Sequence, residues 1–183
     1  MAAQRGWLLL TNDDGIEAVG FSLLVKALHA AGYPLVVLAP AGNHSATGMR
    51  INLMKPMPLR SRDDLLEAWS LDSHQTPVHL FELDGTPCDT MIVALDGGLN
   101  HLVPGVHPQM VVSGVNLGPN LSQDAYHSGT MGAAREAGLY GVPAIASSFT
   151  SFEPAGIEVA VAATLEAVGR AAAVLPLRAE NLG

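Results

Sequence analysis

Two adjacent carboxylates, Asp13 and Asp14, directly follow the apolar run Leu8–Leu10 and precede Gly15. A short continuous apolar run is typical of a buried parallel strand, and open α/β sheets bind ligands just beyond the carboxyl ends of their strands. Two carboxylates there repel each other and resist burial unless a positive charge lies between them. A divalent cation of the Mg²⁺ type is one such partner. A solvated turn in which an aspartate caps the next helix is the alternative, and this stretch alone leaves both open.

Small polar residues also follow three further apolar runs of the chain. Including the first run, the residues at these four ends are Asp13 and Asp14, Asn43 and Ser45, Ser113 and Asn116, and Ser147 and Ser148. The carboxyl ends of parallel strands share one edge of a sheet, which is where α/β folds bind their ligands. Four such ends in register therefore predict a binding site at that edge.

The polar loop after the second apolar run offers oxygen atoms that suit a hard cation. Ser45, Asn43 and Thr47 offer neutral oxygens that could complete a hard-cation shell, and Asn116 can add an amide carbonyl. All four are also ordinary turn residues, so each has a purely structural alternative. His44 has two interpretations, as a base or phosphate contact and as a surface-loop histidine.

Residues 128–130 begin a helix of small residues whose first turn is suited to binding an anion. Ser128 is a good N-cap, and Gly129 and Thr130 leave backbone N–H groups unobstructed, so the helix dipole favours a phosphate there. An ordinary serine cap with close packing of the helix on a sheet is the alternative. Asn120 could hold a substrate oxygen or simply occupy a turn.

Hydrophobic periodicity predicts the elements that position these residues. An apolar strand, a helix with the 3.6-residue repeat and a second apolar strand form a βαβ unit, whose strands are expected to be parallel with a right-handed crossover. A glycine ends the helix and a proline ends the second strand. The expected strands are 7–10, 35–39, a segment from 110 and 144–148, and the expected helices are 19–31, segments from 87 and from 128, and 157–174.

Residues 49–84 are the least regular part of the chain. Two short segments, 51–53 and 78–83, alternate apolar and polar residues and are therefore expected to be strand-like. Prolines interrupt the stretch between them, and residues 60–64 have the composition of a charged turn. We expect an insertion with extended pieces that packs on the side of the sheet or on another subunit.

The helix that starts at residue 87 has a recognisable beginning. Thr86, Pro87 and Asp89 have the spacing of an N-cap, a first-turn proline and a capping-box acid. Cys88 has no His or second Cys close in the sequence, so a buried, inert thiol is expected rather than a nucleophile.

Composition and charge limit the classes of function. The chain has 183 residues, 9 Lys and Arg against 17 Asp and Glu, and a net charge of −8, so a surface that tracks nucleic-acid phosphates is not expected. The length predicts a single domain over residues 1–183. One cysteine excludes an internal disulfide, and neither a signal peptide nor a membrane-spanning run is recognised, so a cytoplasmic location without a membrane partner is expected.

Taken together, several short stretches resemble the stationary-phase survival protein E (SurE) family of metal-dependent nucleotidases. They occur in the family's order over roughly the first 150 residues. The matching stretches are Leu9–Gly15, Ala39–Pro40 with Asn43–Ser45, Gly85–Pro87 with Asp89, Val112–Gly118 with Asn120, Ser128–Thr130, Gly132–Glu136 and Pro143–Ala146.

The resemblance implies a Rossmann-like, three-layer α/β fold with a mostly parallel sheet and extended hairpin insertions. It implies a metal-dependent phosphomonoesterase acting on nucleoside 5′- and 3′-monophosphates, with one divalent cation, Mg²⁺ or Mn²⁺, in each subunit. By position, the implied metal ligands are Asp13, Asp14, Ser45 and Asn116, and the catalytic residues are Asp13, Asp14 and Asn116. The substrate and phosphate are expected to contact Asn12, Asn43, Ser113, Gly114, Asn120, Ser128, Gly129 and Thr130.

The sequence departs from the family pattern in three places. His44 stands where the family usually has Gln, and Cys88 precedes Asp89 where the family commonly places Cys after the Asp. Family members also continue into a further strand and a C-terminal tail, so residues 181–182 are expected to begin that strand. Homodimers or homotetramers, built partly through the hairpins and the C-terminal segment, are implied.

Other classes of protein share the acidic pair. A phosphoacceptor signalling domain needs a further Asp at the end of the third core strand, where this chain has Ser113-Gly114-Val115-Asn116. An aspartyl-nucleophile phosphatase of the haloacid dehalogenase type needs an Asp-x-Asp pattern, whereas these acids are adjacent and alternate in direction along an extended chain. A non-catalytic nucleotide-binding module remains an alternative to the enzyme.

Overall fold

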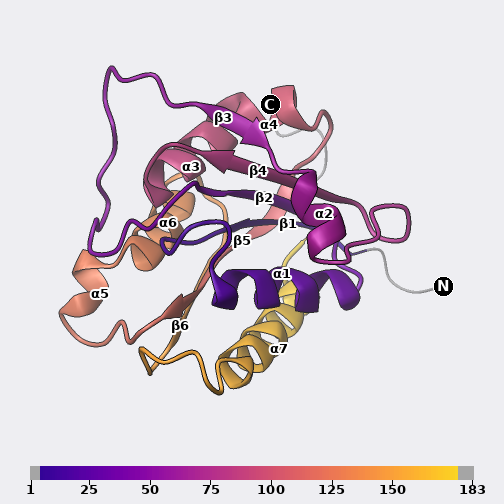
Figure 1. Ribbon diagram of the computed structural model, residues 1–183. Helices are drawn as coiled ribbons and strands as arrows, with labels where there is room; N and C mark the ends of the chain where they lie inside the picture. Colours follow the sequence, from indigo (N-terminus) through magenta and orange to yellow (C-terminus); the bar gives the residue numbers. More distant parts are fainter. Residues whose placement is uncertain (1–4, 177–183) are drawn as a thin grey trace.

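A six-stranded sheet with helices on both faces forms the core of the computed structural model, which describes residues 5–176 (Figure 1). The strands are β1 (Trp7–Thr11), β2 (Leu35–Pro40), β3 (Leu59–Ser61), β4 (Val78–Leu83), β5 (Pro108–Leu117) and β6 (Ala144–Phe149). The helices are α1 (Val19–Ala30), α2 (Asp64–Ala68), α3 (Pro87–Val93), the kinked turn η1 (Ala94–Gly98), α4 (Leu99–Leu102), α5 (Asp124–His127), α6 (Gly129–Leu139) and α7 (Glu158–Val174).

The sheet is mostly parallel, as the sequence predicts. Its strand order is β3-β4-β2-β1-β5-β6, and β3 alone pairs antiparallel with its neighbour. Every residue of β2 is buried, because helices cover both of its faces. The α/β fold with a mostly parallel sheet is therefore confirmed.

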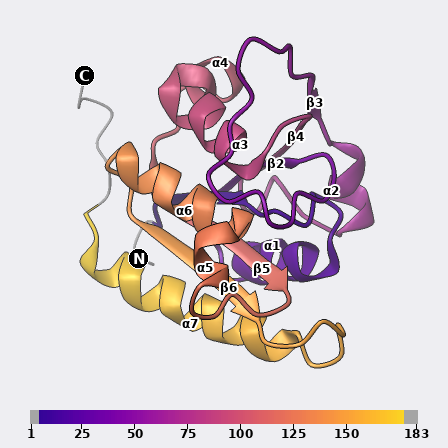
Figure 2. The ribbon, with the colours of Figure 1, turned by 90° about the vertical axis from the view of Figure 1, so that its left-hand side faces the viewer.

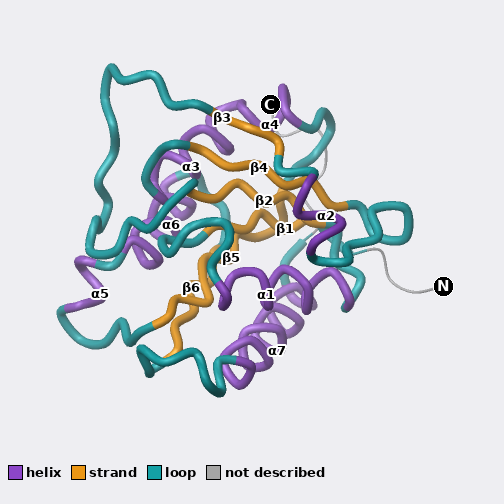
Figure 3. The backbone as a smooth tube through the Cα atoms, in the orientation of Figure 1, coloured by secondary structure: helices purple, strands orange, loops and turns teal. Residues whose placement is uncertain are grey.

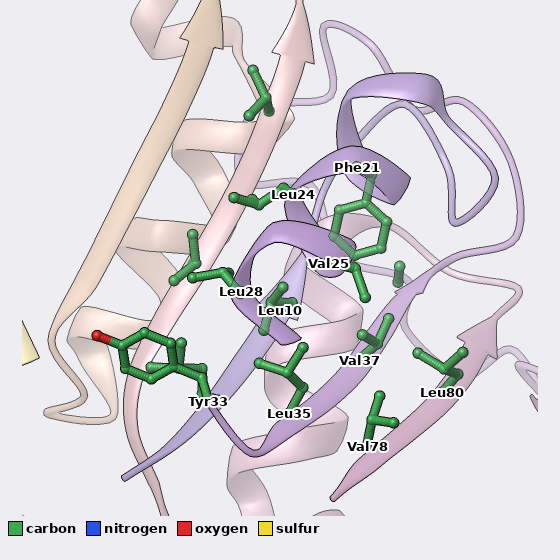
Figure 4. Packing of buried hydrophobic residues seen from close by; sticks show 14 of the residues in the cluster. Leu10, Phe21, Leu24, Val25, Leu28, Tyr33, Leu35, Val37, Val78 and Leu80 are labelled. Carbon is green, nitrogen blue, oxygen red and sulfur yellow. The ribbon is translucent and has the colours of Figure 1, made fainter. Parts of the chain in front are cut away.

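Two layers of helices enclose this sheet, and the two faces have separate apolar cores. Helices α1, α2 and α7 cover one face, and α3, α4 and α6 cover the other (Figure 2). Alternate residues of β1 point to opposite faces, so Leu8 and Leu10 join the α1 side while Leu9 joins the α6 side. On the α1 side, Phe21 and Leu24 are fully buried against the strands (Figure 4).

The least regular part of the sequence differs from its expectation in three respects. The strand expected at residues 78–83 is confirmed as β4, but it pairs with β2 within the sheet, whereas the sequence predicts an insertion packed on the side of the sheet. Residues 51–53 form no strand and lie in the long loop between β2 and β3 (Figure 3). The charged turn at 60–64 is the end of β3 and the start of α2, where Arg62 pairs with Glu82 at 2.7 Å. Alternation alone cannot distinguish these cases, because it does not show which segments find a pairing partner.

The predicted cap of α3 is confirmed, and it also holds the long loop of residues 41–58. The Thr86 side chain accepts from the Asp89 N–H, while the Asp89 carboxylate accepts from the Thr86 N–H. The same carboxylate accepts hydrogen bonds from the Asn52 N–H (2.9 Å) and from Asn52 Nδ2 (2.6 Å), and the Thr86 hydroxyl donates to the Arg50 carbonyl. The loop is thereby tied to the start of α3. Burial raises the pKa of the adjacent Cys88 thiol to about 12, which agrees with an inert cysteine.

Within residues 5–176, every helix falls short of the length and apolar character that a membrane crossing requires. The strand expected to begin at residues 181–182 lies outside the described part of the chain.

Replacing Asp89 by alanine is expected to lower the free energy of unfolding by about 2–4 kcal/mol. The substitution removes both a helix cap and a buried charged acceptor of the Asn52 hydrogen bonds. Urea unfolding measures the change. The exposed neighbour Asp84 provides a control, because its alanine variant is expected to stay within about 0.5 kcal/mol of the wild type. Equal effects of the two substitutions would contradict the anchoring role.

Candidate active site

A cleft opens where the carboxyl ends of β1 and β5 lie side by side. The chain leaves β1 toward α1 on one face of the sheet and leaves β5 toward α6 on the other, which creates the crevice where open α/β sheets bind ligands. The cleft has a volume of about 280 Å³. It is lined by Asp13, Ser45, Ala46, Asn116, Leu117, Gly118, Pro119, Asn120, Asp124, His127, Ser128 and Phe152.

Asp13 is buried against the first turn of α6. Its Oδ1 accepts a hydrogen bond of 2.5 Å from the Thr130 hydroxyl, and the backbone N–H groups of Gly129 and Thr130 also favour its ionised form. A Cβ atom at Gly129 would lie 2.8 Å from the Asp13 Cβ, so only glycine permits this approach. The helix N-terminus predicted to bind an anion therefore meets the carboxylate of Asp13 in this structure.

Asp14 connects three segments that lie far apart in the sequence. Its Oδ2 accepts a hydrogen bond of 3.0 Å from the Leu117 N–H at the end of β5. Its Oδ1 lies 3.5 Å from Nδ2 of Asn43, in the loop after β2. Asp14 is half-buried, and these two contacts hold its carboxylate between β1, β5 and that loop.

The electrostatic balance of this acidic pair is unfavourable without a cation. Burial raises the pKa of Asp13 and of Asp14, and for Asp14 the negative charge of Asp13 raises it further. Among the ion pairs formed within residues 5–176, none includes either carboxylate. Nor does this range contain a cluster of three or more His, Cys, Asp and Glu suited to a metal ion. The oxygen donors to a cation here would be two carboxylates and neutral groups.

The loop after β2 packs directly on the end of β1. The His44 N–H donates to the Asp13 carbonyl (2.6 Å), and the Ser45 N–H donates to Oδ1 of Asn43 (2.8 Å). These bonds bring Ser45 to the same cleft as Asp13. Burial, with the nearby charge of Arg50, lowers the pKa of His44, whose ring is not among the groups that line the cleft.

The amides of Asn116 and Asn120 both line the cleft. Nδ2 of Asn116 donates to the Gly118 carbonyl (2.8 Å), which leaves the carbonyl oxygen of that amide as the candidate ligand atom. Nδ2 of Asn120 donates to the Ser148 hydroxyl (2.7 Å), so one of its two N–H groups is used within the protein. The Ser128 hydroxyl accepts from the Met131 N–H, as expected for an N-cap, and also lines the cleft.

Several residues predicted at the strand ends are not part of the cleft lining: Asn12, Asp14, Asn43, Ser113, Gly114, Ser147 and Ser148. Asn12 and Ser113 are buried, and the Oδ1 and the Oγ of these two residues have no hydrogen-bond partner within the described structure. The Ser147 hydroxyl is 2.5 Å from that of Thr164 on α7. A Cβ at Gly114 would lie 2.3 Å from the Ser147 carbonyl, so this glycine serves the close approach of β5 and β6. Because successive side chains of a strand point to opposite faces, a position at the end of a strand does not by itself show whether the side chain faces the cleft.

Phe152, His127, Asp124 and Pro119 line the cleft although sequence reasoning did not select them. They lie in the segments after β5 and β6 rather than directly at a strand end. The only signal for His127 is that it precedes the helix cap Ser128, and none marks Phe152. Folding of the loops over the sheet edge brings these side chains to the site.

Comparison with known proteins relates this site to one family. The model of Survival protein SurE matches residues 8–180. Curated relatives named 5′-nucleotidase SurE include that of Desulfitobacterium hafniense (strain DSM 10664 / DCB-2), which is 40% identical over 145 residues, covering 79% of this chain and 51% of the relative. The Gloeobacter violaceus relative is 37% identical over 157 residues, covering 81% and 53%.

A solved structure of the same family has a similar fold. The SurE protein from Aquifex aeolicus superposes with a TM-score of 0.74 and 29% identity, over 93% of this chain and 61% of that one. The chain spans about half the length of the curated relatives it matches. From the match over residues 8–180 and the shared fold, the chain belongs to the Survival protein SurE family.

Proposed function

We propose that this chain carries the active site of a metal-dependent nucleotidase, which hydrolyses nucleoside 5′- and 3′-monophosphates to the nucleoside and phosphate. The observation that carries the proposal is the acidic pair: Asp13 lines the cleft, Asp14 is bonded to the cleft residue Leu117, and neither forms an ion pair within residues 5–176. The curated relatives are named 5′-nucleotidase, which supports hydrolysis of nucleoside 5′-monophosphates.

The residues present fit one divalent cation. Asp13, Ser45 and Asn116 line the same cleft, and Asp14 is bonded to the residue that follows Asn116. All four offer oxygen atoms, which suit Mg²⁺ or Mn²⁺ better than a softer metal. A cation would also offset the burial of two negative charges, which raises the pKa of both aspartates. We therefore propose Asp13, Asp14, Ser45 and Asn116 as its ligands.

A cation at this position supplies Lewis-acid polarisation of a phosphoryl oxygen and lowers the pKa of water. The protein's part is to hold its groups in place before the substrate arrives. Thr130 and the N-terminus of α6 fix the Asp13 carboxylate, and the Leu117 N–H fixes that of Asp14. We propose that Asp14 orients the attacking water, because its contacts with three segments restrict its movement.

The phosphoryl group needs hydrogen-bond donors that are already in position. The remaining N–H of the Asn120 amide and the hydroxyl of Ser128 lie at the cleft and can donate to phosphoryl oxygens. Such donors stabilise the negative charge that the transition state carries. Asn43, Gly129 and Thr130 contact Asp13 or Asp14, so we propose that they act by positioning the acidic pair. Substrate contacts from Asn12, Ser113 and Gly114 are part of the proposal.

We also propose that the protein works in the cytoplasm as a homodimer or homotetramer. The loop of residues 41–58 supports assembly, because Leu53 and Met54 on it are 75% and 105% exposed. Apolar side chains gathered on one exposed loop favour contact with another protein surface. The single cysteine agrees with a reducing compartment.

The proposed reaction is tested by phosphate release from a panel of nucleoside monophosphates with Mg²⁺, with Mn²⁺ and with EDTA. We expect release that EDTA abolishes. Replacing Asp14 by asparagine is expected to lower kcat/KM by about 100-fold or more, because it removes one charge at the reacting centre. Asp84→Asn, at an exposed carboxylate, is the control. Full metal-dependent activity in Asp14→Asn would refute the mechanism, and nucleotide binding without release would favour a non-catalytic module.

The metal site can be tested independently of turnover. A cation that binds only the folded protein at 100 times its Kd adds about 2.7 kcal/mol of stability, which is a rise in Tm of about 5–10 °C for a chain of this size. We expect Mn²⁺ or Mg²⁺ to produce this rise by differential scanning calorimetry and EDTA to reverse it. Asp13→Asn and Asp14→Asn are expected to lose most of the shift. An unchanged shift in both variants would locate the metal elsewhere.

A further inference from the structure

The cleft lining includes an aromatic side chain, Phe152, that the proposed hydrolysis does not use. Phe152 lies in the loop between β6 and α7, and its side chain lines the cleft that also contains Asp13 and Asn116. It is 75% exposed. The lining residues Leu117 and Pro119 are apolar as well, whereas Asp13, Asn116, Asn120 and Ser128 give the same cleft acid, amide and hydroxyl groups.

The Phe152 ring is seated on the backbone of the strand that carries the site. A Cβ atom at Gly118 would lie 2.7 Å from Cε1 and 3.0 Å from Cδ1 of Phe152, so the ring packs edgewise where a side chain would otherwise be. Gly118 also has φ of +122°, which L side chains rarely adopt. The glycine thus provides a place for the ring, while most of the ring's surface remains open to solvent.

The distance from the reacting centre to this ring suits a nucleoside. Gly118 follows Asn116 by two residues, and its carbonyl accepts from the Asn116 amide. Two residues of backbone span at most about 7 Å. In a nucleoside monophosphate, one ribose separates the phosphate from the base. A phosphate bound between Asp13, Asn116 and Ser128 would therefore bring the base within reach of the Phe152 ring on Gly118.

We propose that Phe152 is the stacking surface for the base of the nucleoside monophosphate. The inference rests on the proposed function, since that function places the phosphate in the same cleft. Stacking on an aromatic ring strengthens binding with little discrimination, because every base has a π-face. Phe152 contributes affinity for the nucleoside, and the acidic pair contributes the chemistry.

The test compares adenosine 5′-monophosphate with ribose 5-phosphate, which has the same phosphoester and sugar but no base. Calorimetry in EDTA, where turnover is not expected, gives a Kd for each ligand. The Kd of ribose 5-phosphate divided by the Kd of adenosine 5′-monophosphate isolates the contribution of the base. Base–aromatic stacking contributes about 1–3 kcal/mol, so Phe152→Ala is expected to reduce this ratio by about 5- to 150-fold. Phe152→Tyr is expected to preserve it, because it keeps the ring.

Two further variants keep the test decisive. Tyr126→Ala removes an aromatic side chain of nearly equal exposure (73%) that does not line the cleft, and it is expected to leave the ratio unchanged. Phe152→Leu keeps an apolar side chain without the ring, and it answers the question if the alanine variant does not fold. A ratio near one in the wild type, or a ratio that Phe152→Ala and Phe152→Leu leave unchanged, would overturn the inference.

Binding and phosphate release separate the two proposals. A ratio of Kd values well above one in the wild type that falls in Phe152→Ala, together with no phosphate release with any metal, would support the stacking surface and refute the hydrolysis. Metal-dependent release with a ratio unaffected by Phe152→Ala would support the hydrolysis and refute the stacking surface.

Discussion

The burial of two adjacent carboxylates at one sheet edge is the constraint on which this site depends. Asp13 and Asp14 repel each other, and removal from water raises the pKa of both. The fold opposes that cost with fixed dipoles: the Thr130 hydroxyl and the start of α6 face Asp13, and the Leu117 N–H faces Asp14. These contacts keep the acidic groups in one arrangement, and we propose that they leave room for a single compensating cation.

Close approach of backbone segments makes those contacts possible. Gly129 lets α6 start against Asp13, and a Cβ at Gly132 would lie 2.1 Å from the Gly48 carbonyl, so the long loop after β2 also rests on this helix. The same loop is tied to α3 through Asn52 and Asp89. The site is therefore assembled by packing between elements rather than by a contiguous motif. Gly129 serves both the packing of α6 and the position of Asp13.

The cleft lining combines two kinds of side chain. Asp13, Asn116 and Asn120 contribute acidic and amide oxygens, whereas Leu117, Pro119 and Phe152 are apolar. A ligand that fits both kinds of lining carries a strongly charged group and a flat, weakly polar group joined by a short spacer, which describes a nucleoside monophosphate. Phosphate hydrolysis and base stacking would thus use one cleft through different physical interactions: electrostatic stabilisation of the phosphoryl group and stacking of the base.

Local chemistry in the sequence determined the parallel core strands, the helix caps at Thr86 and Ser128, and the grouping of polar residues at strand ends. These features depend on neighbouring residues and on the period of apolar side chains, which a sequence displays directly. Only the tertiary structure decided that residues 78–83 join the sheet, that the N-terminus of α6 meets Asp13 and that Phe152 reaches the cleft. Each of those outcomes depends on which distant segments pack together, and local patterns carry no information about such long-range partners.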